Sequence, residues 1–385
     1  MVSHKGFNSI AVTTHYLEDL LNSQAAFDLR AQGPLVALPR FPATRYQGSK
    51  RKVLPLLKQT FDRIEFASCI DLFSGTGTVT LLLRLLGKKT LSNDFLAFNR
   101  ACARLFQTIT PELLSGTDHA TQLAYLIQYA PLDGPRYVGT NYSGVFFLDE
   151  ENEQIDRFAQ HIRAVEEPLQ SLYIYAFGQA LLKKRPYNLF HRSNLSMRTK
   201  DVKRSFGNAV TWETPAIKHA LNAVDELRKF PLGDPIVGST VMGVNTQNIE
   251  DIPNSVDLVY LDPPYVNSRG TGVDYSDFYG FLDGLCDHSL FNKPDHDYPH
   301  KPIGRQYSAW IKADSALFEL ERIRERFSSS VLVMSYRSDG SPGLHQINEV
   351  LGAGGRCIEV FSTGGYKYAL SQAQGSDEIV IVASP

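Results

Sequence analysis

The chain has 385 residues, a hydrophobic fraction of 43% and a formal net charge of −2 at pH 7. This length predicts two or three domains, and this hydrophobic fraction can bury a substantial core. The cysteines lack Cys-x-x-Cys spacing, which excludes a disulfide framework and a zinc ribbon: Cys69, Cys102, Cys286 and Cys357. No run of about eighteen apolar residues predicts a membrane span, and no apolar signal core follows the first residues. We therefore expect a cytoplasmic protein.

We expect residues 1–40 to form an N-terminal extension. Residues 45–54 read RYQGSKRKVL, in which Gly48 and Ser49 predict a turn and a helix N-cap. The helix is expected to run to about Phe61. Taken alone, the segment is typical of a solvated, basic helix start.

Residues 71–79 read DLFSGTGTV and lie between an apolar strand and an amphipathic helix. Glycines in such a turn let the backbone approach a ligand at the start of the helix. The third glycine of a dinucleotide fingerprint is missing, because residue 80 is Thr. Asp94 ends a second short strand nineteen residues after Gly75, where doubly wound folds hold ribose hydroxyls. Asn93-Asp94 is also common turn chemistry.

The interval after Asp94 is predicted to be mainly helical, with helices over residues 113–126, 151–175 and 215–228. Between them, residues 183–204 carry a local excess of basic side chains over the single acid Asp201. Asn, Tyr and Phe are interleaved with the basic residues, and this mixture suits phosphate contacts combined with base-edge readout. A charge run by itself more often marks a solvated face.

A strand is predicted over residues 238–245, followed by Asn248 in a loop. The strongest signal comes next, because residues 255–261 read SVDLVYL and are followed by Asp262-Pro263-Pro264-Tyr265. Proline lacks the N–H that a central strand needs, so the strand must leave the sheet there. Asp262 is then left at the carboxyl edge, where open α/β sheets bind ligands. A carboxylate, free prolyl carbonyls and an aromatic ring describe a pocket for a planar ring that carries an amino group.

Further downstream lie four residues of the types that bind zinc: Cys286, His288, His296 and His300. Their chemistry could hold zinc, but Pro294 and Pro299 disfavour a helix that would present the imidazoles together, so we expect no metal. A strand over residues 330–334 and a terminal hairpin of residues 358–361 with 378–383 are predicted. Tyr366 and Tyr368 lie between the hairpin strands. A functional role for them and a structural role in covering a sheet edge are about equally consistent with the sequence.

Together these motifs resemble the S-adenosylmethionine-dependent DNA adenine-N6 methyltransferases of the α group, the D12 class that includes the Dam-like and FokI-like enzymes. Residues 262–265 resemble motif IV, residues 71–79 motif I, Asp94 the motif II acid, residues 45–54 motif X, and residues 366–368 motif VIII. Their order along the chain matches the α group. The resemblance implies an α/β fold with a doubly wound, mostly parallel seven-stranded sheet, a terminal antiparallel hairpin and an inserted, mainly helical target-recognition domain.

The resemblance also divides the chain and assigns its site. Residues 41–110 and 235–385 would form the catalytic domain, and residues 111–234 the recognition domain. The catalytic residues would be Asp262, Pro263, Pro264 and Tyr265. S-adenosylmethionine would be bound by Tyr46, Lys50, Asp71, Phe73, Gly75, Gly77, Asp94, Asn248 and Asp262.

Double-stranded DNA is the partner that the resemblance implies, since the basic run lies where this family carries its recognition domain. The expected DNA-binding residues are Lys183, Lys184, Arg185, Asn188, His191, Arg192, Asn194, Arg198, Lys203, Arg204 and Asn208. A separate restriction endonuclease would be the functional partner in a bacterial cytoplasm or nucleoid, and the enzyme itself would be a monomer or weak dimer.

The implied reaction is methylation of a flipped adenine, with Asp262 and the Pro263 carbonyl accepting the two hydrogens of the amino group and Tyr265 stacking on the base. Cytosine-N4 methylation, which uses a related tetrapeptide, stays open as an alternative. A catalytically silent DNA-binding protein on the same scaffold is the second alternative.

Overall fold

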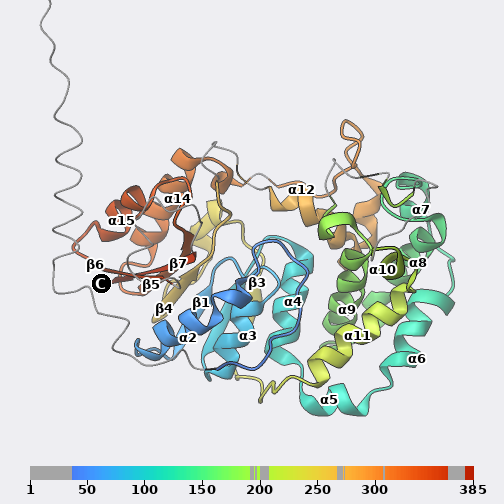
Figure 1. Cartoon of the computed structure of the whole chain (residues 1–385), viewed down its shortest axis with the longest axis horizontal. Helices are drawn as coiled ribbons and strands as arrows, with labels where there is room; N and C mark the ends of the chain where they lie inside the picture. The colour runs from blue at the N-terminus through green and yellow to red at the C-terminus, as the bar shows by residue number, and fades with distance from the viewer. Residues whose placement is uncertain are drawn as a thin grey trace, which may run out of the picture.

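The computed structural model describes residues 37–190, 195, 197–199, 208–266, 272, 274–306, 308–362 and 378–385. Figure 1 shows a sheet with its covering helices on one side of the molecule and a lobe of helices on the other. No helix within these ranges is both long and apolar enough to cross a membrane.

The sheet confirms the predicted fold class. Its strands are β1 (Ser68–Asp71), β2 (Lys89–Asn93), β3 (Thr240–Met242), β4 (Leu258–Leu261), β5 (Val331–Arg337), β6 (Cys357–Ser362) and β7 (Glu378–Ser384). They form one seven-stranded sheet in the order β3-β2-β1-β4-β5-β7-β6. The first five strands in this order are parallel, whereas β7 runs antiparallel to both β5 and β6.

Alternating side chains of β4 belong to two separate cores, one on each face of the sheet. Leu258 and Tyr260 pack with α2 (Leu54–Asp62), α3 (Thr78–Leu85) and α4 (Ala97–Thr108). Val259 and Leu261 pack with α14 (Ala313–Arg326) and α15 (Leu344–Gly352). Successive strand residues point to opposite faces, so a strand covered on both faces must be apolar throughout. This is why residues 258–261 read as a continuous hydrophobic run.

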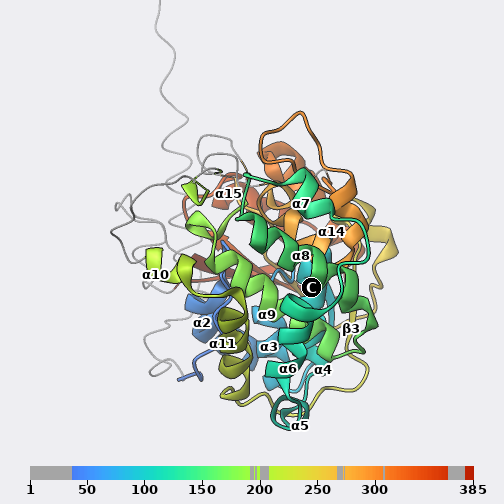
Figure 2. The ribbon, with the colours of Figure 1, turned by 90° about the vertical axis from the view of Figure 1, so that its right-hand side faces the viewer.

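The helical lobe surrounds one deeply buried helix, α9 (Leu169–Lys183), which packs on α4 and on α11 (Ala216–Arg228). A Cβ atom at Gly178 would lie only 2.2 Å from the Phe98 ring, so glycine is required for this close approach to α4. The other elements of this lobe are α5 (Pro111–Gly116), α6 (His119–Ala124), η3 (Tyr125–Tyr129), α7 (Tyr137–Asn141), α8 (Asp149–His161), η4 (Ile162–Ala164), η5 (Pro186–Asn188) and α10 (Asn208–Glu213). Figure 2 shows α6, α8, α9 and α11 together on this side.

Three predicted elements are corrected. The helix expected over residues 151–175 is broken between α8 with η4 and α9, because Pro168 cannot continue a helix from the preceding turn. The helix expected over residues 113–126 is split into α5 and α6, and Asp118 caps the start of α6 by accepting from the Thr121 amide. The strand expected over residues 238–245 is shortened to β3, with Gly238 in a left-handed turn before it.

After β4 the chain crosses to the helical lobe before it returns to α14. This excursion contains α12 (Tyr275–Tyr279), η8 (Gly280–Leu282), α13 (Asp283–Cys286) and η9 (His288–Asn292). Phe281 anchors it in an aromatic cluster by stacking on Phe190, with ring centroids 4.7 Å apart. The same ring meets Tyr142, Phe146 and Phe291. These contacts anchor residues 280–292 on the helical lobe.

Candidate functional site

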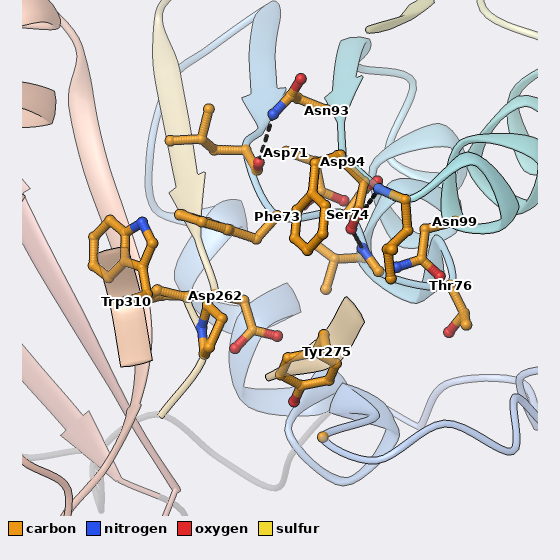
Figure 3. Close-up of a pocket in the computed structure, with 18 of the residues that line it drawn as sticks. Asp71, Phe73, Ser74, Thr76, Asn93, Asp94, Asn99, Asp262, Tyr275 and Trp310 are labelled. Atoms are coloured by element: carbon orange, nitrogen blue, oxygen red, sulfur yellow. Dashed lines mark hydrogen bonds between the residues drawn. The ribbon is translucent and has the colours of Figure 1, made fainter. Parts of the chain in front are cut away.

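A cleft of about 930 Å³, its open mouth included, lies at the carboxyl ends of β1, β2 and β4. This is the edge of a doubly wound sheet at which ligands bind. Figure 3 shows Asp71, Asp94 and Asp262 around this space, with Trp310 and Tyr275 on either side of Asp262 in the view shown. The structure thus brings the residues predicted from three separate motifs to one site.

The glycine-rich turn after β1 is fixed by Asp94. The Gly75 amide donates to Asp94 Oδ2 at 2.9 Å, and the Leu96 amide donates to Asp94 Oδ1 at 2.9 Å. Gly75 has φ +50°, and a Cβ atom there would meet no atom within 4 Å, so the turn leaves open space on its cleft side. Burial raises the pKa of the Asp94 carboxyl to about 6.

Gly77, which was predicted to bind the cofactor, is not among the residues that line the cleft. It is the N-cap of α3, with φ +76°. A Cβ atom there would lie 2.7 Å from the Phe106 ring and 3.2 Å from the Ala103 backbone. Glycine is needed at this position so that α3 and α4 can pack closely.

Three buried polar atoms on the cleft wall have no hydrogen-bond partner within the described residues: Asp71 Oδ1, Ser74 Oγ and Asn99 Oδ1. The other Asp71 oxygen accepts from the Thr80 hydroxyl at 2.8 Å, and burial raises the pKa of Asp71 to about 7. Buried polar groups are normally satisfied, so each of these atoms calls for a ligand or a water molecule. The two acceptor oxygens suit an ammonium or a hydroxyl, and the serine hydroxyl can donate to a carboxylate.

Asn93, the last residue of β2, lines the cleft and links the loops that follow the two neighbouring strands. Its Nδ2 donates to the Leu72 carbonyl at 3.1 Å and to the Val244 carbonyl at 2.9 Å, while its Oδ1 accepts from the Val244 amide at 2.9 Å. One amide side chain therefore ties the loop after β1 to the loop after β3. The sequence motif predicted a role for Asp94 but did not indicate this linking role for Asn93.

Asn248, predicted to contact the cofactor, is exposed and does not line the cleft. It lies in η7 (Thr246–Asp251), one turn beyond the residues of this loop that reach the cleft: Val244, Asn245 and Thr246. The Thr246 hydroxyl accepts from Trp310 Nε1 at 3.0 Å, and Trp310 meets the Phe73 ring edge-on at 5.2 Å. Trp310 is a wall residue that the motifs did not indicate.

Asp262 is held by two donors on one oxygen. Lys50 Nζ lies 2.8 Å from Asp262 Oδ1, and the Tyr265 hydroxyl donates to the same oxygen at 2.9 Å. The Lys50 ammonium also lies 4.7 Å from the centre of the Tyr265 ring. Burial raises the pKa of Asp262, while the charge and hydrogen bond of Lys50 act to lower it. Within the described chain, no donor reaches Asp262 Oδ2 or the Pro263 carbonyl.

Tyrosines form the wall that closes the cleft near Asp262. Tyr46 stacks on Tyr279 at 3.8 Å between ring centroids and lies parallel to Tyr275 at 5.6 Å. A Cβ atom at Gly48, which has φ +84°, would lie 2.9 Å from the Tyr275 hydroxyl. Residues 45–54 and α12 are therefore packed against each other, and both Tyr46 and Tyr275 face the cleft.

Of the four basic residues of this run that the structure describes, three that were predicted to contact DNA are buried: Lys184, Arg185 and Arg198. Lys184 lies 2.9 Å from Glu151 and donates to the Trp212 carbonyl at 2.7 Å. Arg198 pairs with the same carboxylate. Arg185, which is 2% exposed, donates to the Phe146 carbonyl at 2.8 Å. These cations stabilise the helical lobe and are not available to phosphates in this structure.

Lys183 and Asn188 of the predicted DNA-binding set are partly exposed. His191, Arg192, Asn194, Lys203 and Arg204 lie outside the described residues, as do Tyr366 and Tyr368. For Asn208 the structure describes the backbone, at the start of α10, and not the side chain.

Of the residues weighed as metal ligands, His288 is engaged elsewhere. Its Nε2 lies 2.8 Å from Asp156 Oδ1, and Asp156 also accepts from the Val138 and Gly139 amides at 2.9 Å. Among the described residues, no group of three or more His, Cys, Asp or Glu side chains could hold a metal ion.

The arrangement combines two kinds of binding space. Near the glycine-rich turn, Asp71 and Asp94 offer acceptors for the ammonium and hydroxyl groups of an elongated ligand. Near the end of β4, a carboxylate and a free prolyl carbonyl face a space with aromatic side chains on its walls, which suits a planar base with an amino group. A group transferred from one space to the other would pass beside Asp262.

Comparison with known proteins identifies this architecture. The family described as D12 class N6 adenine-specific DNA methyltransferase matches residues 46–319. The chain is also 22% identical over 337 residues to the Type II methyltransferase M2.HphI of Haemophilus parahaemolyticus, an alignment that covers 84% of this chain and 92% of the relative. A methyl donor and a DNA substrate follow from the family. The chain belongs to the D12 class of N6 adenine-specific DNA methyltransferases.

Proposed function

We propose that this enzyme transfers the methyl group of S-adenosylmethionine to the N6 atom of an adenine flipped out of duplex DNA at a specific site. The observation that carries the proposal is the single cleft that contains Asp71, Asp94 and Asp262. Family membership fixes the adenine amino group as the acceptor. The residue roles below are our assignment.

S-adenosylmethionine fits the chemistry of the cleft. The unpartnered oxygens of Asp71 and Asn99 suit its ammonium group, and the Ser74 hydroxyl suits its carboxylate. Asp94 suits the ribose hydroxyls, and Phe73, Thr246 and Trp310 offer an apolar wall with a polar edge for its adenine. When bound, the cofactor supplies a methyl group that its sulfonium centre already activates.

Asp262 and the Pro263 carbonyl would accept the two hydrogens of the target amino group. The nitrogen lone pair is delocalised into the purine ring, and these acceptors favour its localisation toward the methyl donor. Positive charge that develops on the nitrogen is stabilised by the Asp262 carboxylate. Tyr265 would stack on the flipped base, since a base within a duplex is out of reach. Pro264 would fix the direction in which this loop leaves β4.

Asp262→Ala tests this assignment. We expect the variant to retain binding of S-adenosylmethionine within about threefold and to lose turnover by at least about 10²–10³-fold, the usual effect of removing a preorganised polar group. Calorimetry would measure cofactor binding, and transfer of a labelled methyl group to DNA would measure turnover. Residual turnover within tenfold of the unaltered enzyme would refute the role of Asp262.

We further propose that residues 111–234 form the target-recognition domain, with residues 41–110 and 235–385 as the catalytic domain and residues 1–40 as an extension. Lys183, Lys203 and Arg204 would contact phosphates, and Asn188, His191, Arg192, Asn194 and Asn208 would read the sequence. The relative is named a Type II methyltransferase, which supports a separate cognate endonuclease as the functional partner. Action on genomic DNA by a monomer or weak dimer in the cytoplasm is part of the same proposal.

A further inference from the structure

Behind Asp262 lies a second acid, Glu378, which no motif indicated. Glu378 is the first residue of β7, and its Oε2 atom lies 3.9 Å from Lys50 Nζ. Lys50 Nζ is also 2.8 Å from Asp262 and 3.3 Å from the Gly48 carbonyl, while its side chain is only 4% exposed. One buried ammonium from the N-terminal part of the chain therefore lies within 4 Å of two carboxylates that are far apart in the sequence.

We propose that Glu378 is a positioning residue for methyl transfer, which acts by holding Lys50 and by keeping the group around Asp262 net negative. This inference rests on the proposed role of Asp262. Lys50 alone would neutralise Asp262, leaving little net charge to stabilise a nitrogen that becomes positive. With Glu378 ionised as well, two carboxylates share one ammonium, and a net negative charge faces the reacting nitrogen.

Other groups around Glu378 leave its charge directed at Lys50. Its cross-strand neighbour on β5 is Arg337, which forms a two-pronged ion pair with Asp339 at 3.0 and 2.9 Å. Glu378 Oε2 is buried and has no hydrogen-bond partner within the described residues. Burial and the charge of Asp262 raise the pKa of Glu378, and Lys50 and Arg337 lower it. Within the described residues, Lys50 is the cation that forms an ion pair with this carboxylate.

The contact between Glu378 and Lys50 would also help the target base to reach Asp262. Lys50 and Tyr265 both donate to Oδ1 of Asp262, the carboxylate that must accept a hydrogen from the target base. A second carboxylate near Lys50 would let the ammonium shift away from Asp262 while it stays paired. Glu378 does not line the cleft and makes no contact with the substrate in this account.

The test compares Glu378→Gln with a matched control, Glu359→Gln. Both side chains are 32% exposed and lie in the terminal hairpin, but Glu359 pairs with Arg63 at 3.3 Å, on β6 and outside the cleft. In single-turnover methylation of saturating DNA, we expect Glu378→Gln to reduce the rate roughly tenfold. The Kd for S-adenosylmethionine should stay within twofold, and Glu359→Gln should match the unaltered enzyme. Glu378→Asp should recover part of the loss.

Measuring the same substitution in a Lys50→Met variant distinguishes a positioning role of Glu378 from a merely structural one. With Lys50→Met in place, Glu378 would face Asp262 without a cation between them, and its charge would favour a protonated, inactive Asp262. Adding Glu378→Gln in that background should leave the rate unchanged or increase it. Equal losses in both backgrounds, or no loss beside Lys50, would overturn the inference. If instead Asp262→Ala kept its activity, the proposed function itself would fail.

Discussion

At the residue scale, the chemistry depends on how strongly Asp262 holds a proton. Burial raises its pKa, and the Lys50 ammonium 2.8 Å away opposes that rise. The ionised carboxylate is the stronger acceptor for a hydrogen of the target amino group, and only this form carries the charge that stabilises a nitrogen becoming positive. Activity should therefore be present above the pKa of Asp262 and should be lost as the pH falls through it, at a pH above that expected for an exposed carboxyl group.

Lys50→Met should move this acid limb to higher pH. Loss of the ammonium removes the main influence that lowers the pKa of Asp262, so a larger fraction of the enzyme is protonated at any given pH below neutrality. The measurement is the single-turnover rate from pH 5 to 9 for both proteins, with Lys52→Met, which alters an exposed neighbour, as control. An acid limb that stays in place or moves to lower pH would contradict this view of Lys50.

Single residues could be predicted where a motif requires a particular chemical group. Asp262, Gly75 and Asp94 were found in this way and lie in the cleft. Asn248 was placed there by its position after a predicted strand, but a helical turn carries it to the outside. Trp310 and Glu378 could not be found, because each approaches the site only through the folded chain.

At the scale of elements, the glycine-rich turn shows that two similar glycines have different tasks. Gly75 and Gly77 both adopt left-handed backbone conformations, with φ of +50° and +76°. A side chain at Gly75 would enter open space, whereas one at Gly77 would collide with α4. One glycine therefore keeps the cleft open, and the other allows two helices to pack.

Replacing each with alanine gives a matched pair. Gly75→Ala carries the cost of a left-handed alanine, about 1–2 kcal/mol in the free energy of unfolding. Gly77→Ala adds overpacking against Phe106 and Ala103, and we expect a total loss of about 2–5 kcal/mol in the free energy of unfolding. Urea denaturation of the two variants checks the difference. If Gly75→Ala were the more destabilised, the assignment of the two glycines would be reversed.

Strands were predicted better than helices, and for a physical reason. The central strand β4 is covered on both faces, so its sequence LVYL is apolar throughout and is followed directly by Asp262. The helices of the inserted region share a broad apolar periodicity that continues across breaks. Pro168, at the end of a Glu-Glu-Pro sequence, was the available sign that residues 151–175 form two helices.

At the scale of the whole molecule, the described part of the basic run divides into buried and partly exposed side chains. Lys184, Arg185 and Arg198 lie inside the helical lobe, while Lys183 reaches its surface. The sequence alone could not separate them, because Glu151, the partner of Lys184 and Arg198, is distant along the chain. Charge density alone therefore overstated the number of basic residues that are exposed.

Lys183→Ala should therefore affect mainly DNA binding, whereas Lys184→Ala should affect mainly stability. Lys183→Ala should weaken binding to all DNA sequences alike and reduce the slope of log affinity against log salt by about 1, with little change in stability. Lys184→Ala should lower the free energy of unfolding by about 2–3 kcal/mol, because it breaks a buried ion pair. Salt-dependent binding assays and urea denaturation on both proteins would check this. Equal effects on both measurements would contradict the division.

The central claim is that this chain methylates adenine N6 through the cleft at Asp262. Its most direct test is to map modified bases in the DNA of cells that express the chain or its Asp262→Ala variant. We predict N6-methyladenine at one recurring sequence with the unaltered chain and none above background with the variant. Methylation of cytosine, or an unchanged adenine signal with the variant, would contradict the account.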